Sequence, residues 1–236
     1  MEGDISVIIP SAGLGLRMGT QTRKPYITID KKPIVFHTLD KFYKLNRIKE
    51  IILVVNKEDI STVIEDWSDK LKIYKVASVI EGGERRQDSV YNGLCHLSSD
   101  TEIVLVHDAV RPFVSNEAIE AVIKKVDEMG AAILASPMKA TVKKADSNLN
   151  IIETIPRHDL WMAQTPQGFK RSIIIEAYEK IRNTDAEFTD DAEVVEKGGY
   201  TVKIVQGNDD NIKITTREDL KLAESKCKGV KGQTLK

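Results

Sequence analysis

A glycine-rich loop with two cations follows the first apolar run of the chain, and its residue types suit a polyphosphate. The loop has the sequence SAGLGLRMG over residues 11–19, and Arg17 and Lys24 add fixed positive charges to it. Because glycine has no Cβ, Gly13 and Gly15 let backbone N–H groups approach an anion closely. The stretch therefore predicts a phosphate-binding loop, although a glycine-rich turn with surface charges is the alternative.

Two better-known phosphate loops do not match this stretch. A dinucleotide-binding G-x-G-x-x-G would need glycine where Met18 stands, together with an acidic residue about 20 positions further on. A P-loop would need G-x-x-x-x-G-K-[ST], which no register of the stretch supplies. The loop thus belongs to neither class.

Three further groups of polar residues follow apolar runs and could act with this loop. Residues 81–89, EGGERRQDS, offer close backbone approach, donors and acceptors for the edge of a base. Asp108 is a candidate Mg²⁺ ligand, with helix or turn capping as the alternative, and Arg111 is a candidate cation with a surface ion pair as its alternative. Lys213 has apolar neighbours on both sides, and a lone lysine in that position is more often solvated than catalytic. His107 is assigned no role. No serine–histidine–aspartate set and no zinc cluster stands out, so positioning and charge stabilisation of phosphoryl or nucleotidyl transfer is the predicted chemistry.

Alternating strands and helices position these loops. Apolar runs predict strands, and residues at helical spacing predict helices. The expected strands span 5–9, 51–55, 73–80, 103–106, 131–135 and 200–205, and the expected helices span 34–43, 57–70, 86–97, 115–129, 171–181, 190–197 and 216–227. This order predicts an α/β fold with a mostly parallel twisted sheet, in which ligands bind beyond the carboxyl ends of the strands. We therefore expect the glycine loop, Gly83, Asp108 and Pro137 to converge on one edge.

Residues 137–160 break this pattern. Two short β-like runs, at 140–144 and 151–155, flank the polar turn ADSNLN. They predict a β-hairpin arm inserted in the α/β domain, and an isolated hairpin needs something to pack on. A second subunit is the natural candidate. We expect one domain over residues 1–227, followed by a frayed basic tail at 228–236.

Composition narrows the function classes. The chain has 236 residues and a formal net charge of −1, with basic and acidic residues interspersed, so it favours neither nucleic acid nor an anionic membrane as a partner. No apolar stretch approaches the roughly 20 residues needed to span a bilayer, and the N-terminus does not resemble a signal peptide. The two isolated cysteines suggest a reducing compartment. We expect a cytoplasmic protein, or the mature form of one in the plastid stroma.

Six motifs in order make the chain similar to a known family. They are SAGLGLRMG (11–19), EGGERRQDSV (81–90), VHDAVRPF (106–113), LWMAQTPQ (160–167), FTDDA (188–192) and NIKITT (211–216). Together they resemble the 2-C-methyl-D-erythritol 4-phosphate cytidylyltransferases of isoprenoid biosynthesis, over nearly the whole chain. The resemblance implies a Rossmann-like nucleotidyltransferase domain that transfers CMP from CTP to the sugar-alcohol phosphate, with Mg²⁺ and with release of pyrophosphate.

The resemblance also implies a role for each matched residue. The loop at 11–19 wraps the triphosphate, Arg17 and Lys24 neutralise it, and Lys213 lies at the α-phosphate. The residues matched to the nucleotide are Ser11, Ala12, Gly13, Gly15, Gly83, Glu84, Ser89 and, beside the ribose and the metal, Asp108. Those matched to the second substrate are Thr141, Arg157 and Thr215, with Arg111 nearby. The hairpin arm at 137–160 resembles a dimer arm that carries Arg157 to the partner's active site.

Three rival interpretations remain. A sister family uses ribitol 5-phosphate with the same nucleotide site, and this chain departs from the family pattern at Ala140, where an acidic residue is common. Lys143, Lys144 and the LWMAQTPQ run favour the erythritol enzyme. A transferase of another base specificity is disfavoured by Gly83, Glu84 and Ser89. A degenerate nucleotide-binding regulatory module would have lost Lys24, Asp108 or Lys213, and this chain retains all three.

Overall fold

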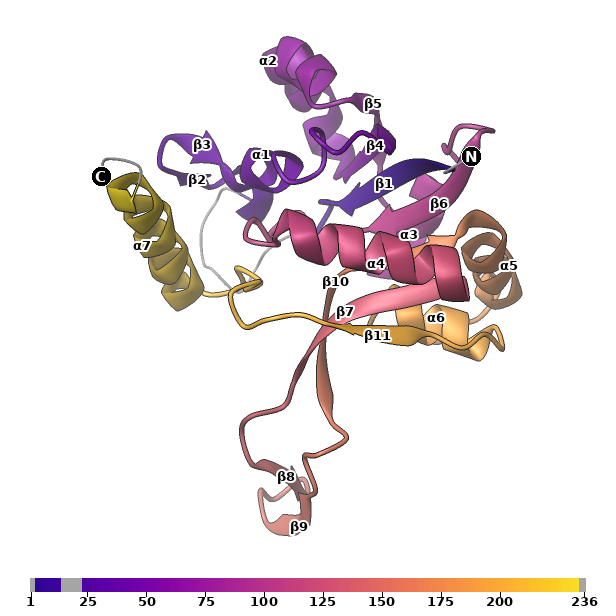
Figure 1. Ribbon diagram of the computed structural model, residues 1–236, viewed down its shortest axis with the longest axis vertical. Helices are drawn as coiled ribbons and strands as arrows, with labels where there is room; N and C mark the ends of the chain where they lie inside the picture. The colour runs from indigo at the N-terminus through magenta and orange to yellow at the C-terminus, as the bar shows by residue number, and fades with distance from the viewer. Residues whose placement is uncertain (1–2, 14–22, 234–236) are drawn as a thin grey trace.

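A seven-stranded sheet forms the centre of the molecule, with strand order β11-β7-β10-β6-β1-β4-β5. The structure is a computed structural model that describes residues 3–13 and 23–233 (Figure 1). The strands of this sheet are β1 (Asp4–Pro10), β4 (Ile48–Val55), β5 (Val76–Glu81), β6 (Thr101–Val106), β7 (Ala131–Pro137), β10 (Trp161–Lys170) and β11 (Lys203–Gln206). Only β10 runs antiparallel to its neighbours in this sheet. The predicted α/β class with a mostly parallel sheet is confirmed.

Helices cover both faces of the sheet. They are α1 (Ile34–Leu39), α2 (Ile60–Ile73), α3 (Arg86–Leu94), α4 (Asn116–Met129), α5 (Arg171–Ile181), α6 (Asp191–Lys197) and α7 (Arg217–Gln233), with 3₁₀ turns η2 (Lys24–Tyr26) and η3 (Lys57–Asp59). Helices α1, α2 and α4 pack on one face, and α3, α5 and α6 on the other. Side chains of β1 alternate between the two cores, with Val7 in the first and Ile8 in the second. This explains the continuous apolar runs, because a strand covered on both faces needs no polar side.

Local signals fix where α4 begins and ends. The Ser115 side chain accepts a hydrogen bond from the Ala118 backbone N–H (3.2 Å), as an N-cap does. Gly130 ends the helix in the left-handed region at φ +87° and donates to Val126 O (2.8 Å). The strand β7 follows at once. The predicted boundaries of this helix are therefore confirmed.

The segment between β7 and β10 extends away from the sheet (Figure 1). Its strands β8 (Val142–Ala145) and β9 (Ile151–Ile155) pair antiparallel. The Asp146 side chain closes the turn by accepting from the backbone N–H groups of Asn148 (2.9 Å) and Asn150 (2.8 Å). Leu149, Ile151 and Ile152 are all more than half exposed in the single chain. That this arm serves for dimerisation stays a prediction.

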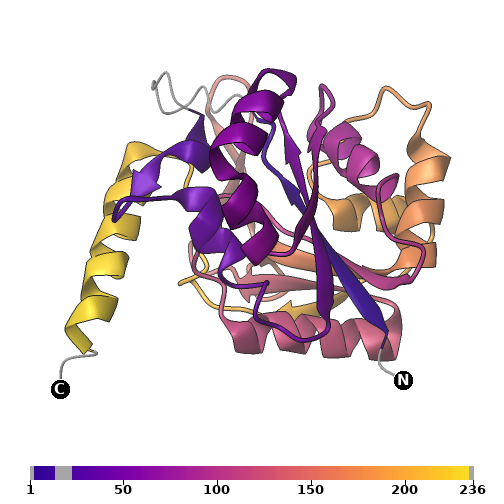
Figure 2. The same ribbon diagram turned by 90° about the horizontal axis from the view of Figure 1, so that it is seen from above.

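Helix α7 lies at one end of the molecule beside a small two-stranded sheet (Figure 2). This sheet consists of β2 (Thr28–Ile29) and β3 (Lys32–Pro33). Ala223 of α7 forms a separate buried cluster with Ile29, Ile34 and Ile214. At the start of this helix the Asp219 N–H donates to Thr216 Oγ1 (3.1 Å) and the Thr216 N–H donates to Asp219 Oδ2 (2.8 Å), which forms a capping box. It continues to Gln233, six residues beyond the expected end at 227, so the tail predicted to fray from 228 is helical over 228–233.

Several predicted boundaries were wrong. The strand expected at 73–80 begins only at Val76, because α2 extends to Ile73. The strand expected at 200–205 covers Lys203–Gln206. The strand β10 was missed altogether, because its mixed sequence WMAQTPQGFK has neither a clean alternation nor a continuous apolar run. No helix within the described residues is long and apolar enough to cross a membrane.

Candidate functional site

A cavity of about 690 Å³ opens at the carboxyl ends of the parallel strands. The segments that follow β1, β4, β5 and β6 all contribute to its wall, together with η2 and the segment before α7. The lining residues are Pro10, Ser11, Ala12, Gly13, Lys24, Pro25, Asn56, Gly83, Glu84, Arg85, Arg86, Ser89, Asp108, Ala109, Val110, Lys213 and Thr215. This is the position at which α/β sheets bind ligands.

Most of the predicted site residues line this cavity. Those brought together are Ser11, Ala12, Gly13, Lys24, Gly83, Glu84, Ser89, Asp108, Lys213 and Thr215. Gly15 and Arg17 lie outside the described residues. Thr141 and Arg157 lie in the exposed arm and line neither this cavity nor the smaller one beside it. Pro137 ends β7, which runs parallel to β6, so it lies at the same edge of the sheet as predicted. It does not line the cavity, because the chain continues from it into the arm.

Two loops pack tightly against each other at the predicted base-binding segment. The backbone N–H of Gly83 donates to Ser89 Oγ (3.1 Å), which fixes the loop to the start of α3. A Cβ at Gly82 would lie 2.4 Å from the Ala12 Cβ and 2.9 Å from Ser89 Oγ. Glycine is therefore required at residue 82, so that the segment after β5 can approach Ala12 in the segment after β1.

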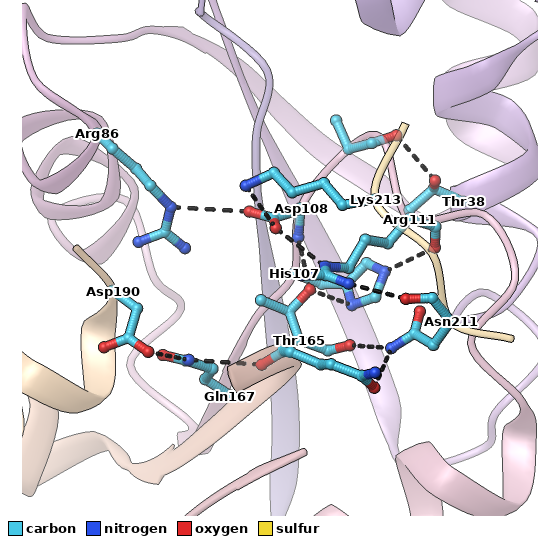
Figure 3. A network of polar contacts seen from close by, with 12 residues as sticks. Thr38, Arg86, His107, Asp108, Arg111, Thr165, Gln167, Asp190, Asn211 and Lys213 are labelled. Carbon is cyan, nitrogen blue, oxygen red and sulfur yellow. Dashed lines mark hydrogen bonds and ion pairs between the residues drawn. The ribbon is translucent and has the colours of Figure 1, made fainter. Parts of the chain in front are cut away.

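Asp108 is the centre of a cluster of charges, shown in Figure 3. Its carboxylate lies 3.0 Å from Lys213 Nζ, 3.2 Å from Arg111 Nε and 3.7 Å from Arg86 Nε. Burial alone would raise the pKa of Asp108, but the charges of Lys213, Arg86 and Arg111 outweigh it and hold that pKa well below its usual range. Asp108 is therefore ionised, and the surrounding cations leave a net positive charge at the end of β6.

Sequence reasoning missed Arg86 and Asp191. Arg86 Nη2 lies 2.7 Å from Asp191 Oδ2, and the Tyr178 hydroxyl donates to Asp191 Oδ1 (2.7 Å). Burial alone would lower the pKa of Arg86, but Asp191 and Asp108 raise it above its ordinary value. Asp191 is fully buried, and buried carboxylates need partners of this kind. Arg86 and Asp191 each lie in one of the six motifs, at 81–90 and 188–192. Their separation in the sequence gives no indication that the two side chains are in contact.

A second, smaller cavity of about 170 Å³ adjoins the first. Its lining residues are Arg86, Asp108, Arg111, Ala163, Gln164, Thr165, Gln167, Thr189, Asp190 and Lys213. Three of these, Arg86, Asp108 and Lys213, also line the larger cavity. The strand β10 supplies the polar side chains of Gln164, Thr165 and Gln167. Two anions bound in the two cavities would therefore meet at Lys213 and Arg86.

A metal could be held here by Asp108 together with groups from a ligand. Among the residues that the structure describes, no three histidine, cysteine, aspartate or glutamate side chains are grouped closely enough to bind a metal ion. Mg²⁺ keeps several waters and takes one or two carboxylates with phosphate oxygens, so a lone carboxylate in a phosphate-sized cavity fits it. Asp108 is such a carboxylate.

His107 lies directly beneath this cluster and is fully buried. Its Nε2 is 3.1 Å from the Arg111 carbonyl oxygen, and its Nδ1 is 3.0 Å from Thr165 Oγ1 (Figure 3). Burial lowers the pKa of His107 to about 4, so the ring is neutral near pH 7. Because a carbonyl only accepts, Nε2 carries the proton and Nδ1 accepts from the Thr165 hydroxyl.

Acid should therefore destabilise the protein through His107. A folded-state pKa of about 4, against 6.5 unfolded, means that the unfolded chain binds a proton that the folded chain does not. This contribution to the free energy of unfolding is fully present above pH 6.5, decreases as the pH falls towards 4, and amounts to roughly 3 kcal/mol. Urea unfolding of wild type and His107→Gln across this range measures it. The stability advantage of the wild type should shrink with falling pH, and a constant difference would contradict the prediction.

Comparisons with known proteins agree on one family. The family model described as 2-C-methyl-D-erythritol 4-phosphate cytidylyltransferase matches residues 5–228. Proteins of that name from Alkaliphilus oremlandii and Clostridium botulinum are each 45% identical over 219 residues, which is 93% of this chain and 93% and 95% of those proteins. The crystal structure of 4-diphosphocytidyl-2C-methyl-D-erythritol synthase from Anaerococcus prevotii superposes with a TM-score of 0.83 at 35% identity, over 96% of this chain and 97% of the other. The 2-C-methyl-D-erythritol 4-phosphate cytidylyltransferase of Thermus thermophilus gives 0.77 at 28%, over 97% and 100%.

Proposed function

Because the chain belongs to the 2-C-methyl-D-erythritol 4-phosphate cytidylyltransferase family, we propose that it transfers CMP from CTP to 2-C-methyl-D-erythritol 4-phosphate and releases pyrophosphate. One observation carries this proposal beyond family membership. The two adjoining cavities share Lys213, Asp108 and Arg86, so a nucleotide in the larger cavity and a phosphorylated acceptor in the smaller one would meet there. A transferase that joins two phosphates needs this arrangement.

CTP occupies the larger cavity in this proposal. The residues after β5 supply the base contacts, because Gly83 and Glu84 line the wall and Ser89 fixes the loop. The triphosphate lies along residues 11–13 and Lys24, and the sequence adds Arg17 to the same loop. The α-phosphate then reaches Lys213, whose ammonium is 3.0 Å from Asp108.

The acceptor phosphate occupies the smaller cavity, beside Arg111 and Thr165. Thr215 lines the larger cavity instead, and both its N–H (2.8 Å) and its hydroxyl (2.9 Å) donate to the Asp219 side chain, so its proposed contact with the acceptor is less direct. Thr141 and Arg157 lie in the arm, outside both cavities of their own chain. We propose a homodimer in which the arm carries these two residues to the partner's site.

The reaction is an in-line displacement. An oxygen of the acceptor phosphate forms a bond to the α-phosphorus of CTP, and the bond from that phosphorus to the oxygen bridging to the β-phosphorus breaks. Pyrophosphate leaves with the electron pair. Negative charge grows on the bridging and equatorial oxygens, and Lys213 and Lys24 stabilise it. A phosphate nucleophile is already ionised and needs little general base, so His107 can remain buried and neutral.

Mg²⁺ is part of the proposal, with Asp108 as its protein ligand. When bound, the ion would neutralise triphosphate oxygens and so lower the charge that the attacking phosphate meets. Lys213, Arg111 and Arg86 hold the Asp108 carboxylate in place before the ligands arrive.

Pyrophosphate release tests the proposed function. The purified protein is supplied with CTP and Mg²⁺, and with either 2-C-methyl-D-erythritol 4-phosphate or ribitol 5-phosphate. Release with the erythritol compound alone is expected. Pyrophosphate release with ribitol 5-phosphate alone would assign the protein the activity of the sister family. No release with either acceptor, from a folded protein that binds CTP, would favour a nucleotide-binding regulatory module. Substituting UTP for CTP tests the base specificity.

Removing the Ser89 hydroxyl should weaken CTP binding. Ser89→Ala takes away the acceptor that holds the Gly83 N–H, and a lost hydrogen bond of this kind costs about 0.5–1.5 kcal/mol, or about 2- to 10-fold in affinity. Calorimetric titration with CTP measures the dissociation constant. Ser99→Ala, which alters an exposed serine, is the matched control and should bind as the wild type does. Equal affinities in the two variants would remove Ser89 from the base site.

A further inference from the structure

The segment that carries Asp108 and Arg111 is held by hydrogen bonds from three different elements. The His107 N–H donates to Ile8 O of β1 (3.0 Å), and the Thr38 hydroxyl of α1 donates to Ala109 O (2.8 Å). The Asp108 N–H donates to Thr165 Oγ1 of β10 (3.1 Å). The first and second bonds attach the segment to the core. The third places it relative to the smaller cavity, which Thr165 lines.

We infer that His107 is a positioning residue for the acceptor site, since its imidazole joins the Arg111 carbonyl to the Thr165 hydroxyl and so fixes Asp108, Arg111 and Thr165 relative to one another. The inference rests on the proposed function, because it assigns a role in binding and orienting the acceptor. His107 is not a catalytic residue: it is fully buried and lines neither cavity.

Each of the three hydrogen bonds that link Arg111, His107, Thr165 and Asp108 has only one possible direction. The His107 Nε2–H donates to the Arg111 carbonyl oxygen, and the Thr165 hydroxyl donates to His107 Nδ1. The Thr165 oxygen in turn accepts from the Asp108 N–H. A ring with one donor and one acceptor at this spacing is required to link the Arg111 carbonyl to the Thr165 hydroxyl.

A purely space-filling role would make other demands on this position. The Phe42 ring packs on the imidazole with 4.8 Å between centroids, and any apolar side chain of similar volume could satisfy that contact. Such a side chain would leave the Arg111 carbonyl oxygen and the Thr165 hydroxyl proton without their partner. The two roles therefore separate under substitution.

Two conservative variants each keep half of the link. In His107→Asn the shorter amide can still accept from the Thr165 hydroxyl, and in His107→Gln the longer amide can still donate to the Arg111 carbonyl. His107→Leu keeps neither. Phe42→Leu is the matched control, because it disturbs the packing on the ring and keeps both hydrogen bonds. All four are compared with the wild-type protein by thermal unfolding, by CTP titration and by steady-state kinetics with varied acceptor.

The expected effect falls on the acceptor. Outer-shell groups that orient metal ligands typically contribute 10- to 100-fold to activity, and we expect an effect of the same size from a group that orients Asp108, Arg111 and Thr165. In His107→Leu, kcat/KM for 2-C-methyl-D-erythritol 4-phosphate should fall about 100-fold, with a smaller fall of about 10-fold in His107→Asn and His107→Gln. The dissociation constant of CTP should stay within about threefold, and Phe42→Leu should lose stability while its kinetics stay near those of the wild type. Kinetics that follow thermal stability equally in His107→Leu and Phe42→Leu would overturn the inference.

The ring itself gives a readout independent of turnover. Long-range ¹H–¹⁵N spectra distinguish the tautomers of histidine, and the signals absent from His107→Asn identify His107 among the four histidines of the chain. The hydrogen-bond partners predict a proton on Nε2 and none on Nδ1. A ring protonated on Nδ1 would overturn the inference. A wild-type protein without transferase activity would overturn the proposed function, whereas wild-type kinetics in His107→Leu would overturn only the positioning role.

Discussion

Replacing Lys213 with methionine should lower the turnover number by about 10²- to 10³-fold while the dissociation constant of CTP changes only several-fold. Methionine keeps an unbranched side chain that is one atom shorter, and it removes the charge. Lys213 lies on the wall common to both cavities, 3.0 Å from Asp108, where the charge of the transition state would grow. A charge that interacts more strongly with the transition state than with bound CTP changes kcat more than affinity.

Quench-flow measurement of CMP transfer, with CTP titration on the same preparation, checks this prediction. Lys203→Met is the matched control, because Lys203 is an exposed lysine on β11, away from both cavities, and its loss should leave the kinetics unchanged. Lys213→Arg should recover part of the activity by restoring the positive charge. Full activity in Lys213→Met would remove this lysine from the mechanism.

Two inactive variants should restore activity when they form mixed dimers. The Arg157→Ala chain lacks the residue that the arm is proposed to deliver, and the Lys213→Ala chain lacks the lysine at the α-phosphate. In a two-fold symmetric dimer, a mixed pair has one site that combines the intact Lys213 of one chain with the intact Arg157 of the other. Random mixing gives one half mixed dimers with one of two sites intact, so activity should recover to about a quarter of the wild-type value.

Co-refolding of two differently tagged chains, followed by tandem purification of the mixed dimer, provides the sample. The purified mixed dimer should have about half of the wild-type activity, because one of its two sites is complete. Mixing Arg157→Ala with itself under two tags is the control and should stay inactive. Mixed dimers that remain inactive would place Arg157 in its own chain's site, and a chain that stays monomeric would remove the shared site altogether.

Local signals in the sequence predicted much of this fold. The apolar runs at β1, β4 and β6 are continuous because both faces of the sheet are covered, and Ser115 and Gly130 mark the two ends of α4. The alternation of strand and helix then placed the residues after β1, β5 and β6 at one edge. Ser11, Gly83 and Asp108 do line one cavity, so the position of strand ends in a parallel sheet was sufficient to predict that they lie close together.

The parts that could not be predicted depend on contacts between distant segments. The strand β10 carries polar side chains to the smaller cavity, so its sequence has no strand periodicity. The Arg86–Asp191 pair spans 105 residues and forms only because α3 and α6 cover the same face of the sheet. His107 showed the same limit, since a buried histidine with two partners looks in sequence like any histidine at a strand end.

The path of β10 through the sheet bears on how the arm can change during evolution. Ala163 pairs with Ala135 of β7 and Gln167 pairs with Ile133, so three residues of β10 face one residue of β7 at this point. The excess of two residues preserves the alternation of side chains, because the period of a strand is two. Beyond the bulge, Gln167 and Phe169 are paired on both sides, with β6 and with β7. Insertions, deletions or an arm transplanted from a relative can therefore be accommodated before Ala163 without shifting the register of the cavity residues, which makes the arm an exchangeable module.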